Sequence, residues 1–580
     1  FLFAAMSILE PLYEVCIVRM QEWNAANPKL FQLELGEIAS KYRSNIQYFI
    51  YKSIILRNLY GVDIMVEATE IAKLRLFLKM VAVVEVDKRA DNMGLDPLPD
   101  IDFNIRCGNT LVGYATEKQL YDDLMQGDMF ARQEFEQKIQ DRLVVVSAAY
   151  ELFRQVQLTG ADDRVEYAKA KKDLRQHLAD LNELLNRHMF TAAIGSGNEE
   201  DYAEFLSSHQ PFHWLAEYYN IIHGNGGFDV VIGNPPYVEY NKKDPQTKKA
   251  ISDCYRISGY KTESCGNLYA FVLERCKTIT KNESYIGMIV PLSGHSTERM
   301  APLVNNFYKT YGLRLHLNLS ADAHPQKLFE GVKFRLCIFF VSNAHNGHFS
   351  TKYTRWYAEE REFLFKKINY VEDDGYSYGN VIAKIPSLLF LSIAEKIRKE
   401  PVLFYNQGNS FCLYNDAPIN WMRAHTFTPY FVSERDGLIV SRHLKKLYFS
   451  TKEEAEIGCA IINSSLYFQW WLNHSSCYNL NSSEIFSFRL KADKDVSKRL
   501  CSLNRELEKD LLQKSRRRVY VYKTTGRVEY DEFYMKLSKP IIDEIDKVLA
   551  KHYGFTDEEL DFIINYDIKY RMGDELNAND

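Results

Sequence analysis

One short segment limits the fold more than any other part of this 580-residue sequence. Residues 228–233 have the sequence Phe-Asp-Val-Val-Ile-Gly, an apolar run that is typical of a strand in a parallel sheet covered on both faces. Asn234, Pro235, Pro236 and Tyr237 follow at once. Two successive prolines fix φ and remove two backbone N–H donors, so the strand must end there. We therefore predict a stiff turn, rich in hydrogen-bond acceptors, at the carboxyl end of a strand.

Strand and helix patterns alternate on both sides of this segment. Residues 59–64 predict a short strand that ends in an acid, and residues 67–84 carry apolar side chains at helical spacing. A helix is expected over 266–280 and a further strand over 285–291. Such alternation predicts a doubly wound α/β sheet, whose ligands bind beyond the carboxyl ends of the strands.

Length and changes of composition predict several domains. We expect one α/β domain in two parts, residues 1–115 and 221–345. Between them, residues 116–220 are dominated by Glu, Lys, Gln, Leu and Ala and predict a helical insertion. Residues 346–496 are rich in Tyr, Phe, Trp, Ser and Asn and predict a second domain of mixed structure. Residues 497–580 predict a largely helical C-terminal region.

Composition argues against a membrane-spanning protein and against a protein built around cysteine-bound metal or disulfides. The longest apolar runs are far shorter than the roughly 20 residues that a membrane-spanning helix needs, so no membrane partner is expected. Ten cysteines lie far apart, without a CxxC pair or a His-Cys cluster at zinc spacing. We interpret them as reduced thiols of a cytoplasmic protein and expect no metal.

A net charge of -5 decides little about nucleic acid, because many DNA enzymes confine their positive charge to one cleft. Two local clusters of cations are candidates for DNA contact. They are Arg442 with Lys445 and Lys446, and Arg516 with Arg517 and Arg518. An ordinary solvated surface explains each cluster equally well.

The chemistry of the turn suits a planar amino group. The lone pair of such an amino group, as in adenine, is delocalised into the ring and is a poor nucleophile. The side-chain oxygen of Asn234 and the carbonyl of Pro235 can each accept an amino hydrogen, which favours a pyramidal nitrogen that attacks a sulfonium methyl group in line. Tyr237 can stack on a base turned out of the duplex. The alternative is a proline-rich turn capped by a core tyrosine, and the preceding strand makes it the weaker one.

Several ordered blocks, together with Asn234 to Tyr237, resemble the gamma-type adenine-specific DNA methyltransferases of Type II and Type IIG restriction-modification and phage-exclusion systems. These blocks are residues 60–76, 102–111 and 325–334. The resemblance implies a Rossmann-like domain that uses S-adenosylmethionine and a target-recognition domain over 346–496. It also implies methylation of the N6 amino group of adenine in double-stranded DNA by base flipping. A restriction endonuclease or another defence-system subunit is a possible partner.

The resemblance also assigns residues that contact the cofactor. Asp63, followed by Ile64, corresponds to the acid that binds the ribose hydroxyls, although a strand-end acid that caps a helix is as common. Asn109 and Thr110 lie where a polar side chain meets the adenine of the cofactor, although Asn109 is also an ordinary turn former. Asn234 is expected to contact the cofactor as well as the target amino group. Residues 267–269 resemble the segment that runs past the cofactor adenine.

A late loop in the resemblance contains the second residue that stacks on the target base. Phe329 in the 325–334 block would cover the face of the flipped adenine opposite Tyr237. By composition alone, Phe329 is a core residue more often than a stacking one, so this role rests on the resemblance.

One departure from the family matters. The glycine-rich first motif is absent, and Phe1-Leu2-Phe3 resembles the residues that follow it. We therefore expect a fragment that lacks one strand and one wall of the cofactor pocket and that is poorly active alone. No acid-acid-lysine nuclease constellation is evident either, so DNA cleavage is not predicted.

Two other functions remain open. A methyltransferase acting on a protein glutamine amide can use the same turn, but it does not require a large aromatic and basic C-terminal region, whereas reading a DNA sequence requires an element that contacts base edges. A DNA-recognition subunit without catalysis is the other alternative. The intact turn and Asp63 favour an enzyme.

Overall fold

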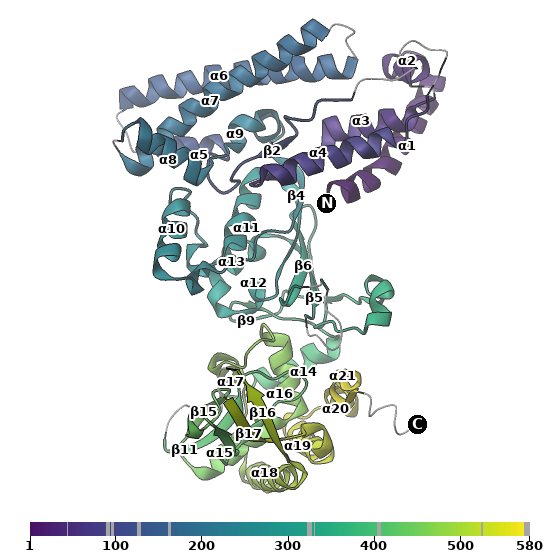
Figure 1. Cartoon of the computed structure of the whole chain (residues 1–580). Helices are drawn as coiled ribbons and strands as arrows, with labels where there is room; N and C mark the ends of the chain where they lie inside the picture. The colour runs from purple at the N-terminus through teal and green to yellow at the C-terminus, as the bar shows by residue number, and fades with distance from the viewer. Residues whose placement is uncertain are drawn as a thin grey trace. The chain divides into compact units, whose positions relative to one another are not determined.

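The computed structural model of the chain describes residues 1–573, except 43, 87, 89–92, 94–97, 125–128, 160–163, 196, 322–327, 330, 403–407 and 524–525. The chain divides into two compact units, Phe1–Ile286 and Gly287–Asp580. Figure 1 labels the helices and strands of both units. Each unit combines helices with short sheets, so the chain is a mixed α/β protein.

The first unit is mostly helical. Its long helices are α1 (Leu2–Ala26), α2 (Gln32–Lys41), α3 (Ile46–Asn58), α4 (Val66–Val81), α5 (Glu117–Leu124), α6 (Met129–Thr159), α7 (Arg164–Ile194), α8 (Glu199–His209), α10 (Pro245–Arg256) and α11 (Leu268–Ile279), with the short α9 (Trp214–Glu217). Its strands are β1 (Gly61–Asp63), β2 (Ile105–Cys107), β3 (Phe228–Gly233) and the first part of β4 (Thr280–Pro291). The strands and helices expected at 59–84, 228–233 and 266–291 are therefore confirmed.

β1 and β2 form a parallel pair in which Asp63 lies opposite Cys107. The side chains that back this pair come from α3 and α4. Ile54, Leu76 and Ile105 are 0 to 3% exposed and belong to one apolar cluster. Burial of each such side chain contributes about 1.5–3 kcal/mol. This packing fixes the carboxyl end of β1, where Asp63 lies.

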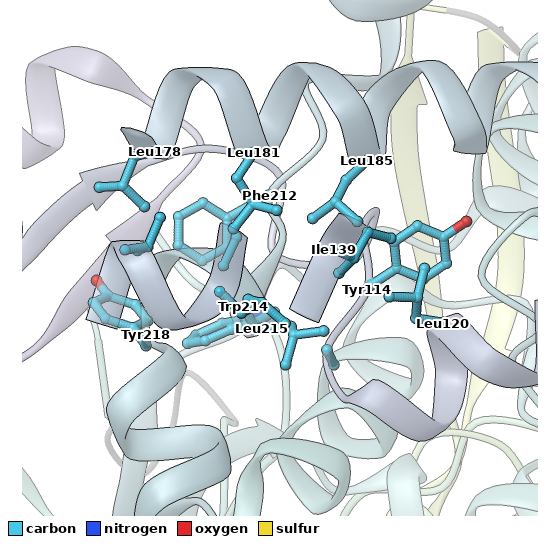
Figure 2. Close-up of a cluster of buried hydrophobic side chains, with 14 of the residues drawn as sticks. Tyr114, Leu120, Ile139, Leu178, Leu181, Leu185, Phe212, Trp214, Leu215 and Tyr218 are labelled. Atoms are coloured by element: carbon cyan, nitrogen blue, oxygen red, sulfur yellow. The ribbon is translucent and has the colours of Figure 1, made fainter. Parts of the chain in front are cut away.

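A second core joins the long helices α6 and α7, which lie side by side in Figure 1. Leu178, Leu181 and Leu185 recur at helical spacing on α7 and are at most 4% exposed. Figure 2 shows them pointing towards Phe212 and Tyr114. The stretch expected to be helical thus packs through one apolar stripe, as an amphipathic helix does.

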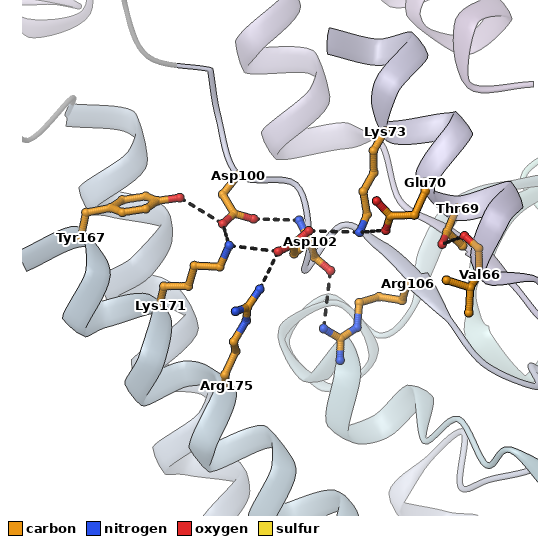
Figure 3. Close-up of polar contacts among 10 residues, drawn as sticks. All are labelled: Val66, Thr69, Glu70, Lys73, Asp100, Asp102, Arg106, Tyr167, Lys171 and Arg175. Atoms are coloured by element: carbon orange, nitrogen blue, oxygen red, sulfur yellow. Dashed lines mark hydrogen bonds and ion pairs between the residues drawn. The ribbon is translucent and has the colours of Figure 1, made fainter. Parts of the chain in front are cut away.

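Ion pairs fasten this helical region to the segment that precedes β2. Asp102 accepts from Lys73 of α4 at 3.0 Å, from Lys171 of α7 at 2.9 Å and from Arg175 of α7 at 2.7 Å (Figure 3). Asp100 pairs with Lys171 and accepts from the Tyr167 hydroxyl. Single exposed pairs contribute little, but a connected network with one shared acceptor restrains three elements at once.

The apolar strand β3 differs from the prediction. Val230 and Ile232 are 57% and 39% exposed, so the strand is not covered on both faces in this unit. An apolar run alone does not distinguish a strand buried on both faces from one that leaves side chains accessible, and the expectation of full burial was wrong here.

The second unit holds the end of β4 and the remaining strands. Its strands are β5 (Leu313–Leu319), β6 (Leu336–Ser342), β7 (Gly347–Ser350), β8 (Val371–Asp373), β9 (Ser377–Tyr378), β10 (Val381–Ile382), β11 (Ser410–Asn415), β12 (Ala424–His425), β13 (Phe431–Ser433), β14 (Gly437–Leu438), β15 (Leu444–Phe449), β16 (Arg516–Tyr522) and β17 (Gly526–Glu532). One sheet has the order β4-β6-β5-β7-β8 in this unit. β5 is antiparallel to β6 and parallel to β7, so the sheet is mixed and the expected parallel arrangement is wrong for these strands.

Helices cover the sheets of this unit. They are α12 (Ser293–Ser296), α13 (Ala301–Asn306), α14 (Leu388–Arg398), α15 (Lys452–Asn463), α16 (Ser465–His474), α17 (Ser482–Ser487), α18 (Lys494–Lys514), α19 (Lys539–Tyr553), α20 (Asp557–Ile564) and α21 (Ile568–Met572). Every residue of α16 is buried. Its N-terminus is satisfied by Asp546, which accepts from the backbone N–H groups of Ser465 and Leu466 at 3.1 and 3.0 Å.

The C-terminal region is not helical throughout. β16 and β17 form an antiparallel hairpin and end a four-stranded sheet with the order β14-β13-β17-β16. The run Arg516, Arg517 and Arg518 therefore lies in a strand. Alternating Val519, Tyr520, Val521 and Tyr522 favour a strand at this point, because β-branched and aromatic residues fit a pleated surface.

Candidate active site

The turn after β3 brings an amide and a phenol together. Asn234 and Pro236 are exposed, Pro235 is buried and Tyr237 is half-buried. The Tyr237 hydroxyl donates a hydrogen bond of 2.6 Å to Asn234 Oδ1. Burial raises the pKa of Tyr237, so this phenol keeps its proton and remains a donor. The turn thus presents its acceptor side chain to solvent while holding it in one orientation.

The downstream end of the turn is anchored to the start of α11. The Leu268 N–H donates to the Val238 carbonyl and the Tyr240 N–H to the Gly266 carbonyl, both at 3.1 Å. Tyr240 is 2% exposed, and its hydroxyl donates to the Glu263 carbonyl at 2.7 Å. Gly266 has a φ of 66°, which glycine adopts without strain. Tyr240, rather than Tyr237, is therefore the core tyrosine of this turn.

Asn267 offers a buried acceptor next to this anchor. Its side chain is 7% exposed, and its Oδ1 accepts no hydrogen bond from any described residue. A buried acceptor without a donor costs about 1–3 kcal/mol, so a ligand N–H or O–H that reaches it would be stabilised. The amino group and hydroxyls of S-adenosylmethionine are donors of this kind, and this residue fits the cofactor.

Asp63 lies at the carboxyl edge of the β1–β2 pair. Its side chain is exposed, and one carboxylate oxygen accepts from the Met65 N–H at 2.8 Å. Its backbone carbonyl accepts from the Gly108 N–H at 3.0 Å. Ile64 beside it is 52% exposed. An exposed carboxylate at a strand end can accept from two vicinal hydroxyls, so the geometry fits the expected ribose contact.

Asn109 is already bonded within the chain. It is 5% exposed, its Nδ2 donates to the His209 carbonyl at 3.1 Å, and its Oδ1 accepts from the Leu111 N–H at 3.2 Å. The carbonyl of Thr110 accepts from the Trp214 indole at 3.1 Å. These bonds join the strand-end turn to the helical region. Turn formation accounts for the geometry of Asn109, and its cofactor contact stays a prediction.

The remaining predicted residues lie in the second unit. Phe329 is 43% exposed, and its stacking role opposite Tyr237 stays a prediction; residues 325–327 and 330 of its loop lie outside the described part of the chain. Arg442 and Lys445 are exposed, and Lys445 lies 3.6 Å from Asp416. Lys446 lies over the Phe411 ring at 4.7 Å.

The three hairpin arginines lie beside residues of β17 or just after it. Arg517 pairs with Asp531 at 2.6 Å, and Arg518 pairs with Glu532 at 2.9 Å. Arg516 lies 5.5 Å from the centre of the Tyr534 ring. The hairpin thus neutralises much of the charge that the sequence run displays.

A basic segment next to the turn was not singled out from the sequence. Four lysines occur within eight residues, at Lys242, Lys243, Lys248 and Lys249, and all four are exposed. The density of lysines directly after the turn is the sequence feature that identifies this segment. Asp244 and Pro245 interrupt the run, so it is less conspicuous than three consecutive arginines.

Comparison with known proteins gives the class to which this region is similar. Residues 57–316 match the family model described as Eco57I restriction-modification methylase. This range includes Asp63, Asn109 and the whole turn from Asn234 to Tyr237. The matched part of the chain therefore resembles a restriction-modification methylase.

One similar protein is named "Putative type II restriction enzyme and methyltransferase RM.MjaORFECS2P" and comes from Methanocaldococcus jannaschii. It is 29% identical over 337 residues, which cover 50% of this chain and 26% of that protein. The alignment thus spans about a quarter of the length of this relative.

Solved structures give weaker likenesses. The Type IIL restriction-modification enzyme MmeI in complex with DNA is 10% identical, with a TM-score of 0.35 over 62% of this chain and 59% of that chain. A DrdV-DNA complex is 11% identical, with a TM-score of 0.29 over 68% and 64%. Because these scores lie below 0.5, they do not establish a shared fold.

No described helix is both long enough and apolar enough to cross a bilayer. Nor does the described part of the chain gather three His, Cys, Asp or Glu side chains in positions to hold a metal ion. All ten cysteines are free thiols.

Proposed function

We propose that this chain is a DNA methyltransferase that transfers a methyl group from S-adenosylmethionine to the N6 amino group of adenine in double-stranded DNA. The observation that supports it most is the Asn234 to Tyr237 turn, held at the carboxyl end of β3 with its amide acceptor exposed. The match of residues 57–316 to a restriction-modification methylase family includes this turn.

S-adenosylmethionine, when bound, supplies an electrophilic methyl group on a positively charged sulfur. Asp63 would hold its ribose hydroxyls, and Asn267 Oδ1 would accept from one of its donors. Asp63 ends β1, where an α/β sheet binds its ligands, and Asn267 precedes α11 and is bridged to Glu239 just after the turn. Asn109 would support this edge indirectly through its bonds to the helical region.

The protein groups act on the adenine amino nitrogen. Asn234 Oδ1 and the Pro235 carbonyl would each accept one amino hydrogen, which turns the nitrogen lone pair away from the ring. The cofactor would supply the methyl group that this nitrogen takes up, its sulfur would keep the electron pair of the broken bond, and a positive charge would develop on the nitrogen beside Asn234 Oδ1 and the Pro235 carbonyl. The two acceptor dipoles stabilise this charge, and one amino proton leaves to solvent. Tyr237 and Phe329 would stack on the two faces of the flipped base.

The name of the archaeal relative combines restriction with methylation. We therefore include in this proposal a restriction endonuclease activity or another defence subunit as the functional partner of the methyltransferase. Cells that methylate a site protect it from such a partner, which explains why the two activities occur together.

The decisive measurement is transfer of labelled methyl from S-adenosylmethionine to double-stranded DNA by the full-length protein. We expect label in N6-methyladenine at one fixed sequence. Asn234→Ala should lower the rate about 100- to 1,000-fold, as loss of one preorganised dipole does elsewhere. Asn225→Ala, an exposed asparagine shortly before β3, is the matched control and should keep the full rate.

Each other result identifies a different function. Label on a protein glutamine and none on DNA would replace the DNA substrate by a protein. DNA binding without transfer to any substrate would indicate a recognition subunit. Transfer that survives Asn234→Ala would overturn the assignment of the turn.

A further inference from the structure

The basic segment after the turn carries three cations that form no salt bridge with any residue that the structure describes. Lys242 pairs with Glu239 at 2.8 Å. Lys243, Lys248 and Lys249 are exposed, and none of them forms a salt bridge with a residue of the described chain. Their charges are therefore available to an external anion. We call these three residues the lysine patch.

The acids of the same segment are occupied elsewhere. Asp244 caps α10, and its carboxylate accepts from the Gln246 and Thr247 N–H groups at 3.1 and 3.0 Å. Asp253 pairs with Arg256 at 3.1 Å. Asp244 keeps its negative charge but directs its carboxylate to the N-terminus of α10, and the three lysines outnumber this acid, so the segment keeps a net positive charge.

The position of the patch is fixed relative to the turn. The backbone bonds of Tyr240 and Val238 to the start of α11 hold the chain between the turn and α10. Ile251 and Tyr255 of α10 pack against the apolar cluster that contains Tyr240. The helix therefore turns its apolar side inward and leaves the lysines in solvent.

The chain length also limits the distance between patch and turn. Lys243, the residue of the patch nearest to the turn, follows Tyr237 by six positions, so the chain between them spans at most about 22 Å when fully extended. One DNA strand rises about 3.4 Å per nucleotide, so this limit corresponds to about six nucleotides. A DNA strand that enters the turn has phosphates within reach of the patch.

We propose that Lys243, Lys248 and Lys249 bind the backbone phosphates of DNA beside the target nucleotide. The proposal rests on the proposed function for the identity of its ligand, and it adds the element that holds the strand next to the reacting base. Lysine ammonium groups on flexible stems suit this task, because a phosphate backbone is bound as a row of point charges rather than read by shape.

The test is a triple variant, Lys243→Gln, Lys248→Gln and Lys249→Gln, in the full-length protein. The logarithm of DNA affinity falls linearly with the logarithm of salt concentration, with a slope that reports the number of phosphate contacts. We expect this slope to become shallower by about 2 to 3 and affinity to fall about 100-fold near physiological salt. The matched triple arginine variant should restore both, because it keeps the charges.

A control removes the same charge elsewhere in the first unit. Lys118, Lys169 and Lys172 are also exposed, and their triple glutamine variant should leave the slope unchanged. An equal loss of slope in this control would show a general charge effect and overturn the lysine patch. An unchanged slope in the patch variant would overturn it as well.

DNA with uncharged methylphosphonate groups at chosen positions shows which phosphates the lysine patch contacts. DNA with methylphosphonate groups beside the target adenine should bind the natural protein more weakly, and the patch variant should not respond to this change. A response only to methylphosphonates more than about six nucleotides away would overturn the proposed position.

These outcomes are separable from failure of the proposed function. If the patch variant loses salt slope as expected but the natural protein transfers no methyl group, the lysine patch stands and the enzymatic proposal fails. If methyl transfer to adenine occurs but the salt slope of DNA affinity is the same in the patch variant, the enzymatic proposal stands and the lysine patch fails. Absence of any DNA binding would overturn both.

Discussion

Two basic segments of this protein differ in what their cations contact. The run Arg516 to Arg518 is conspicuous in the sequence, yet Arg517 and Arg518 face carboxylates of the neighbouring strand β17. The lysine patch is interrupted by an acid and a proline, yet its three ammonium groups have no carboxylate partner in the described chain. Charge density along a sequence is therefore a poor measure of charge that is available to a ligand. In the hairpin, the strand register decides how much charge is available, because it brings carboxylates next to the arginines.

The largest change expected from this comparison comes from releasing the hairpin arginines. Asp531→Asn with Glu532→Gln removes the main acceptors of Arg517 and Arg518. DNA affinity should rise by up to about tenfold, and the salt slope should steepen by about 1 to 2, because freed guanidinium groups can then meet phosphates. Binding titrations over a series of salt concentrations measure both.

The control for this variant removes two acids without freeing an arginine. Glu395→Gln with Glu506→Gln changes two exposed acids of the same unit. If this control raises affinity as much as the hairpin variant does, net charge rather than ion pairing explains the gain, and the contrast between the two segments is lost.

Removing the arginines themselves should have a smaller effect. Arg517→Gln with Arg518→Gln deletes cations that are already neutralised, so we expect less than about a threefold loss of DNA affinity and a slope change below about 0.5. The same salt titrations apply. A loss as large as that of the patch variant would mean that DNA displaces the carboxylates on binding.

The smallest expected effect is in the titration of Glu532. A hydrogen bond from the Tyr534 hydroxyl and the pairing with Arg518 lower the pKa of this carboxyl below its usual 4.5. Because the folded pKa is depressed, the pairing is fully present above pH 4.5 and is lost as the pH falls through the lowered value. Glu532 therefore stays ionised and available to Arg518 from pH 5 to pH 8.

Carbon-detected NMR of the Glu532 carboxyl measures this titration. The pKa should move back towards the usual range in Arg518→Gln, and Arg505→Gln serves as the matched arginine control because its partner is Glu456. A natural value at or above 4.5 would contradict the pairing.

Local patterns predicted most of the elements between residues 228 and 291. The strand at 228–233, the helix that begins near residue 268 and the strand that ends at Pro291 follow from apolar periodicity over short windows. The turn after β3 follows from two prolines. Even its internal hydrogen bond joins residues only three positions apart, which is within the reach of local reasoning.

Contacts between distant positions were not predictable in the same way. The partners of Asn109 lie about one hundred residues further along the chain, at His209 and Gln210. The hairpin carboxylates lie opposite the arginines only because of the register between β16 and β17. The exposure of Val230 and Ile232 depends on which elements pack against β3, and composition does not contain that information.

The hydrogen bond from the Tyr237 hydroxyl means that Asn234 Oδ1 already has a donor before any base binds. In the proposed reaction an incoming amino group exchanges with, or shares, a donor that the acceptor already has. Trading one neutral hydrogen bond for another changes the free energy little, since each contributes only about 0.5–1.5 kcal/mol net. The acceptor then adds little to the capture of a base. Its advantage arises when the nitrogen becomes charged, because a charged donor bonds about twice as strongly. Asn234 should accordingly govern turnover at saturation rather than the concentration of DNA that half-saturates the enzyme.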